Sequence, residues 1–175
     1  MSTQRGQFVH ATTYHSKNSK TGAYLSLTTT PNKTIKRGDI FYIIGDPENP
    51  PVGAEIWSDR AGIIVSNATI CKTSHAVEIV YISTSTTKRL SPTHIPVTSG
   101  NKQAIAICEQ VHTVDVSRLT DYFGHITDEE MIDVENGILF GHGINRGRNP
   151  QGIFRKWENY IRTYHLPTTM KTTLH

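Results

Sequence analysis

The clearest pattern along the chain is a series of short apolar runs between residues 38 and 126. Runs rich in β-branched and aromatic residues predict six strands, at 40–44, 62–65, 76–82, 94–97, 104–108 and 122–126. Pro96 places the fourth strand at an edge, because proline cannot donate a ladder hydrogen bond. The short, regular spacing therefore predicts a small antiparallel barrel or a strongly bent sheet.

Helical periodicity begins where the last predicted strand ends. Thr127 and Glu130 have the spacing of a capping box, and Gly141 is suited to end the helix. Its apolar face is formed by Met131, Val134, Ile138 and Leu139. A second helix is expected at 151–163, with Phe154, Trp157, Tyr160 and Ile161 on one face. Strands followed by one or two helices indicate an α+β fold that is mainly β.

Charge divides the chain into three parts. Residues 1–37 carry six basic residues and no acid, and 143–175 carry six basic residues and one acid. The stretch between them, 38–142, has six basic and 14 acidic residues and a net charge of −8. We therefore expect a flexible basic N-terminal arm at 1–36, a folded domain at 37–142, and a basic C-terminal extension at 143–175. Basic arms of this kind contact nucleic acid, solubilise the protein or dock a partner.

Composition excludes several classes of protein. A chain of 175 residues can bury a core without staples, and its two cysteines cannot form a disulfide scaffold. Cys71 is expected in a loop and Cys108 in the core. The nine histidines show no metal-ligand spacing, and no nucleotide-binding glycine motif is present, so neither metal nor cofactor is expected. Without a long apolar run or a signal sequence, the chain is expected in the cytoplasm, away from membranes.

Three polar clusters are candidates for chemistry. The first closes a long proline-containing loop at 46–59 and joins Glu55, Trp57, Asp59 and Arg60. Loops of this length in compact domains are usually functional, and an arginine fork binds phosphate in a bidentate way. The alternative is an ordinary surface loop in which Asp59 and Arg60 pair incidentally.

The other two clusters follow predicted strands. Ser83, Thr84 and Lys88 belong to a hydroxyl-rich stretch that ends in two cations and could bind phosphate, although it could also be a simple polar turn. Glu109, with Gln110 and His112 close behind it, is expected at a strand end, where a carboxylate could act as a base or orient another group. The alternative for this cluster is a set of caps and turn partners.

Taken together, these segments resemble a known family, the MazF/PemK-like toxins of bacterial toxin–antitoxin systems. The resemblance covers about 37–141 and depends on the order of five segments: RGDIFYI at 37–43, GAEIWSDRAGIIVSN at 53–67, ISTS at 82–85, PTH at 92–94 and ICEQVHTVD at 107–115. The chain departs from the family pattern at four positions, at one of which Ser83 replaces the usual threonine and keeps the hydroxyl. Asp59 stands where some members have histidine, Ala61 replaces proline, and Ile107 stands where one branch has a catalytic arginine.

The resemblance implies a compact SH3-like β-barrel with helices, usually a homodimer. It also implies a metal-independent endoribonuclease that cuts single-stranded RNA at short sequences, leaves 2′,3′-cyclic phosphate and 5′-OH ends, and is neutralised by a cognate antitoxin. Arg60 would then stabilise the phosphorane charge or act as an acid. Ser83, with Thr84 as the alternative, would hold the scissile phosphate, and Glu109 would be the candidate base.

The resemblance also suggests which residues bind RNA. The expected contacts are Glu55, Trp57, Asp59, Thr84, Lys88, Gln110 and His112. A stacking platform at Trp57 would suit splayed bases, and the basic arms would supply attraction that the acidic centre lacks. The alternative function is a non-catalytic module on the same barrel that binds nucleic acid or protein, because a fold does not fix a function.

Overall fold

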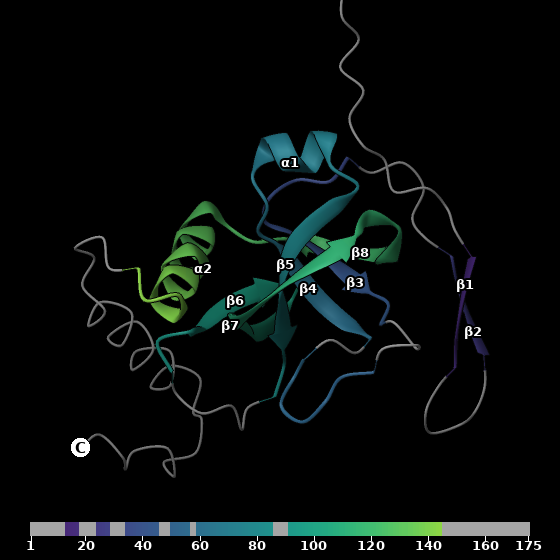
Figure 1. The fold of residues 1–175 in the computed structure, drawn as a ribbon, viewed down its shortest axis with the longest axis horizontal. Coiled ribbons are helices and arrows are strands. Elements are labelled where there is room, and N and C mark those ends of the chain that lie inside the picture. The colour runs from purple at the N-terminus through teal and green to yellow at the C-terminus, as the bar shows by residue number, and fades with distance from the viewer. Residues whose placement is uncertain are drawn as a thin grey trace, which may run out of the picture.

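The computed structural model describes residues 13–17, 24–28, 34–45, 50–56, 59–85 and 91–144 (Figure 1). The strands are β1 (Thr13–Lys17), β2 (Tyr24–Thr28), β3 (Asp39–Ile43), β4 (Arg60–Ile64), β5 (Ala76–Ser83), β6 (His94–Ser99), β7 (Lys102–Asp115) and β8 (Leu119–His125). The helices are α1 (Ala68–Thr73), the short 3₁₀ turn η1 (Val116–Arg118) and α2 (Asp128–Gly141).

The six strands predicted between residues 38 and 126 are confirmed as β3 to β8, which form one antiparallel sheet in the order β6-β7-β5-β4-β3-β8. β6, which contains Pro96, lies at an edge as predicted. The predicted fold class, α+β and mainly β with a helix after the sheet, is confirmed; of the two expected shapes the structure has the strongly bent sheet, because no ladder joins the edge strands β6 and β8 within the described residues. The ladders between β3 and β8 and between β5 and β7 contain register shifts, and such irregularities bend a sheet.

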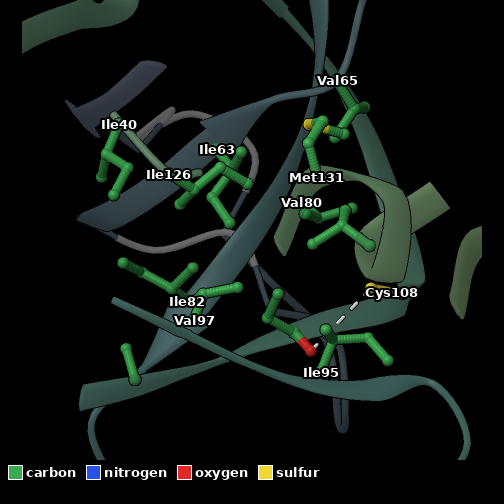
Figure 2. Packing of buried hydrophobic residues seen from close by; sticks show 13 residues of the cluster. Ile40, Ile63, Val65, Val80, Ile82, Ile95, Val97, Cys108, Ile126 and Met131 are labelled. Atoms are coloured by element: carbon green, nitrogen blue, oxygen red, sulfur yellow. Dashed lines mark hydrogen bonds between the residues drawn. The ribbon is translucent and has the colours of Figure 1, made fainter. Parts of the chain in front are cut away.

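The core lies on both faces of this sheet, because alternate side chains of a strand point to opposite faces. On β5, Tyr81 belongs to one buried cluster and Val80 to the other. The cluster that contains Val80 is covered by α2 through Met131 and Val134 (Figure 2). Helix and sheet approach closely at Gly137, where an added Cβ would lie 2.9 Å from Ile95 Cγ1.

Both ends of α2 are fixed by their sequence. The predicted capping box is confirmed: Glu130 N donates to Thr127 Oγ1 at 3.2 Å, and Thr127 N donates to Glu130 Oε2 at 2.9 Å. The other oxygen of Glu130 accepts from Thr98 N at 2.7 Å and so joins the helix start to β6. At the far end Gly143 has a φ of +68°, and Ile144 N donates to Leu139 O at 2.8 Å, which is a Schellman motif.

Several features differ from the sequence-based expectations. Cys71 is not in a loop: it is the buried residue of α1, a helix that begins after the N-cap Asn67. No element was expected in the N-terminal arm, yet β1 and β2 form a hairpin there, and Ile35 is buried in the core. The second helix expected at 151–163 lies outside the described residues.

Candidate functional site

An irregularity in β7 sets the position of Glu109 and Gln110. Across the β5–β7 ladder Val80 pairs with Val111, whereas Ile82 pairs with Ala106, so two steps along β5 match five along β7. The extra residues form a bulge, a feature that re-aims side chains and is common beside active sites. Glu109 therefore lies inside a 14-residue strand, and the prediction that it follows a strand end is wrong.

The Glu109 carboxylate is held from the neighbouring edge strand β6. His94 Nε2 lies 2.8 Å from Glu109 Oε1, and the side chains of the two residues are 11% and 37% exposed. Burial alone would raise the pKa of Glu109. Hydrogen bonds from Thr93, from its own backbone and from His94 outweigh this effect, so the pKa lies below its ordinary value. Glu109 is thus an ionised carboxylate at neutral pH.

Gln110 fastens the loop that precedes β4. Its Oε1 accepts from Ile56 N at 2.7 Å, and its Nε2 donates to Ala54 O at 3.0 Å. The loop also carries its own turn, because Glu55 Oε2 accepts from Val52 N at 2.8 Å. Both Gln110 and Glu55, which sequence reasoning assigned to RNA contacts, are therefore engaged in shaping the loop.

A groove of about 440 Å³ lies between this loop and β7. It is lined by Val52, Ala54, Glu55, Glu109, Gln110, Val111, His112 and His142. Burial lowers the pKa of the His112 imidazole, and the nearby Glu55 carboxylate offsets this only in part. His142, at the C-cap of α2, has its Nδ1 2.8 Å from Ile138 O. The groove thus presents carboxylates and imidazoles, the usual groups for proton transfer.

Arg60 and Asp59 lie at the base of the same loop but do not line the groove. Asp59 Oδ1 accepts from Gly45 N at 2.6 Å, and Arg60 is the first residue of β4. The charge of Arg60 acts on the phenol of Tyr81, whose pKa is nevertheless raised by burial. The Tyr81 ring in turn lies 5.1 Å from the ring of His112, which lines the groove.

Two buried polar atoms belong to these two rings. Among the described residues, the Tyr81 hydroxyl and His112 Nε2 have no hydrogen-bond partner. Such groups are uncommon in native proteins and often belong to functional sites.

Ser83 is the last residue of β5 and pairs with Ile105. If the β4–β5 register, which sets Gly62 opposite Tyr81, is continued, Arg60 falls across from Ser83. The Ser83 hydroxyl accepts from Ser85 N at 3.2 Å, and Thr84 is exposed beside it. Neither residue lines the groove. The predicted sites Trp57 and Lys88 lie outside the described residues.

The structure thus brings Glu109, predicted to be catalytic, into one groove with Glu55, Gln110 and His112, predicted to bind RNA, and leaves the other predicted catalytic residues, Arg60 and Ser83, outside it. The groove also includes His142, and His94 contacts Glu109 from β6 without lining the groove; sequence reasoning missed both. The contact between His94 and Glu109 could not be predicted, because it depends on how β6 pairs with β7. His142 could have been placed at the end of α2, because it directly follows Gly141, the residue predicted to end the helix. Within the described residues, no group of three or more His, Cys, Asp or Glu side chains is arranged to hold a metal ion. In the same residues, no helix has the length and apolarity that a membrane span needs.

The bent sheet, the loop fastened by Gln110 and the groove beside β7 define a small, mainly β domain. Residues 36–140 match the family described as PemK-like, MazF-like toxin of type II toxin–antitoxin systems. Because the match spans more than half of the chain, the protein belongs to this toxin family.

Individual relatives agree with this assignment. Endoribonuclease MazF of Staphylococcus epidermidis is 29% identical over 115 residues, which are 63% of this chain and 93% of that protein. Among solved structures, MazF of Deinococcus radiodurans has a TM-score of 0.55 at 11% identity and covers 64% of this chain and 99% of its own. An endoribonuclease from a mycobacterial species has a TM-score of 0.51 at 18% identity, covering 64% and 94%. The structures support the fold, and the family match carries the assignment.

Proposed function

We propose that this MazF-like endoribonuclease cuts single-stranded RNA at a short sequence, without a metal ion, through the 2′-OH of its substrate. The observation that carries the proposal is the Glu109 carboxylate, held ionised on the wall of a groove that an imidazole and a second carboxylate also line. Membership of the MazF-like family and the name of the S. epidermidis relative support the reaction class. They also disfavour the alternative, a non-catalytic binding module.

The chemistry requires few groups because RNA carries its own nucleophile. Glu109 accepts the proton of the 2′-OH, the O2′–P bond forms, and the P–O5′ bond breaks as the leaving oxygen takes up a proton. Arg60, at the base of the loop and outside the groove, stabilises the charge that develops on the phosphate of an RNA strand that runs from the groove past the loop. Ser83, with Thr84 as the alternative, holds the non-bridging oxygens. The products are a 2′,3′-cyclic phosphate and a 5′-OH end.

RNA recognition is divided between the groove and its surroundings. Glu55 and His112 face the bases in the groove, while Gln110 and Asp59 keep the loop in place. Trp57, Thr84 and Lys88 complete the proposed set of RNA contacts as a stacking platform and as phosphate ligands. Because residues 38–142 carry a net charge of −8, the basic arms supply the long-range attraction to RNA.

We also propose that the protein acts as a homodimer and that a cognate antitoxin neutralises it. The family description names a toxin–antitoxin system, and the Deinococcus radiodurans MazE–MazF structure has a TM-score of 0.50 at 9% identity. That structure covers 65% of this chain and 99% of its own. An antitoxin that occupies the groove would compete directly with RNA.

The test is to incubate the full chain with a long RNA transcript in EDTA and to map both new ends. We expect cuts at one short sequence with 5′-OH ends, lost in Arg60→Ala and Glu109→Gln. Matched controls are Arg37→Gln, which breaks a surface ion pair to Glu135, and Glu78→Gln at an exposed position of β5. Intact RNA with the wild-type protein across many sequences, or equal loss in the controls, would refute the proposal.

A further inference from the structure

We propose that His94 is the positioning residue for Glu109: from the edge strand β6 it holds the carboxylate in the orientation and charge state that the cleavage step needs. The inference rests on the proposed function, because it assigns a partner to the proposed base. It concerns a residue that does not touch the substrate and acts through Glu109 alone.

The contact itself is short and protected. His94 Nε2 lies 2.8 Å from Glu109 Oε1, and the imidazole is 11% exposed. Because an ionised carboxylate can only accept hydrogen bonds, Nε2 carries the proton and donates it. A carboxylate has about four acceptor positions, so capacity remains for the hydroxyl proton of a substrate.

The segment that carries His94 is anchored to the residue before Glu109. Thr93 O accepts from Cys108 N at 2.8 Å, and His94 N donates to Ser91 O at 3.0 Å. The hydroxyls of Ser91 and Thr93 lie 2.8 Å apart, and Thr93 also gives Glu109 a side-chain hydrogen bond. Imidazole, hydroxyl and carboxylate thus form one connected network in which the carboxylate is the outermost, groove-facing member.

The end of α2 packs over this network. A Cβ added at Gly141 would make van der Waals contact with Thr93 Cγ2 at 3.5 Å and with Glu109 Cα at 3.6 Å, so the space between the helix end and these two residues is about one methyl group wide. The next residue, His142, lines the groove. The helix end thus flanks the backbone of Glu109, while the carboxylate itself is held from β6 by His94, which is the kind of preorganisation that proton transfer requires.

Several titratable groups face Glu109 from the elements around it. His94 lies on β6, His142 at the end of α2, and His112 further along β7, while Glu55 belongs to the loop across the groove. The buried thiol of Cys108 precedes it in the chain. Of these groups, His94 is the one with a direct hydrogen bond and a charge effect on the carboxylate. Without His94, burial should outweigh more of the remaining hydrogen bonds, and the pKa of Glu109 should rise.

The experiment compares pH–rate profiles for cleavage of an oligoribonucleotide that contains the mapped cleavage sequence. We expect His94→Phe to move the acid limb of kcat to higher pH and to lower kcat about tenfold at mildly acidic pH, with KM little changed. Activity should recover as the pH rises. His94→Gln retains an N–H donor and should restore most of the wild-type profile.

Two further variants serve as controls. Glu109→Gln should be inactive at every pH, because no carboxylate is left to recover. His125→Phe, the same substitution at another histidine that contacts a carboxylate, removes the 3.0 Å pair with Asp39 and should leave the acid limb in place. A folded His94→Phe protein with an unmoved acid limb would overturn the inference, as would a uniform loss at all pH values.

A second readout separates this inference from the proposed function. ¹³C NMR titration of the Glu109 carboxyl follows its protonation whether or not the protein cuts RNA. His94→Phe should raise the midpoint of that titration, and His94→Gln should restore it. If wild-type protein leaves RNA intact while the midpoint moves, the proposed function fails and the pairing stands; an unmoved midpoint refutes the pairing itself.

Discussion

Removing the Gln110 side chain should release the loop at 50–56 without unfolding the sheet. Gln110→Ala deletes two hydrogen bonds, one from Ile56 N at 2.7 Å and one to Ala54 O at 3.0 Å. At about 0.5–1.5 kcal/mol each, the pair contributes about 1–3 kcal/mol to the docked loop, which corresponds to an opening equilibrium about 5- to 140-fold larger. The rest of β7 is paired with β5 and β6, so global stability should change much less.

The assay is amide hydrogen exchange of Ile56, whose N–H is protected by Gln110. Its exchange should accelerate within the stated range in Gln110→Ala, while amides of β5 keep their protection. The matched control is Gln103→Ala on the same strand, where an exposed glutamine makes one long contact of 3.4 Å to Thr98 Oγ1. Unchanged Ile56 exchange in Gln110→Ala would show that other contacts hold the loop.

Three further predictions concern packing, acid sensitivity and capping. Gly137→Ala should lower the free energy of unfolding by about 1–3 kcal/mol in urea denaturation, because the added methyl group meets Ile95 and Cys108 within about 3.0 Å. The control Gly141→Ala, whose methyl group has contacts of 3.5 Å or more, should be neutral or slightly stabilising. The pKa of His112 is lowered in the folded state, so the unfolded chain binds more protons below about pH 6.5. Stability should therefore fall as the pH drops through that value, and thermal denaturation of His112→Gln should show a weaker dependence. A His112→Gln profile parallel to that of the wild type would contradict this assignment. Thr127→Ala should cost about 0.5–2 kcal/mol of stability by calorimetry, and Thr127→Ser should restore it; equal melting temperatures would exclude a capping contribution.

Local signals in the sequence predicted most elements of the folded domain. Six strands came from β-branched runs, and the start of α2 came from a capping box whose two hydrogen bonds are both present. α1 was missed because its six residues are too few for a helical period to show. Its N-cap Asn67, which accepts from Thr69 N and Ile70 N, was its main local signal.

The site was predictable only as a set of residue types. Glu109 was assigned to a strand end because periodicity breaks there. The break is a bulge, however, and a bulge is visible only when the register of β5 against β7 is known. The pairing of His94 with Glu109 likewise depends on β6 lying beside β7. Such contacts between distant segments leave no pattern in either segment alone.

The two walls of the groove differ in how freely they can change. One wall is β7, where Val111 and His112 pair with β5 and Glu109 is held from β6 by His94. The other wall is a loop that Gln110 fastens to β7 through two hydrogen bonds. Substitutions, insertions or exchanges in the loop therefore reshape half of the groove while the carboxylate opposite keeps its place. An evolving family can in this way acquire new ligand preferences on one wall and retain an old proton acceptor on the other.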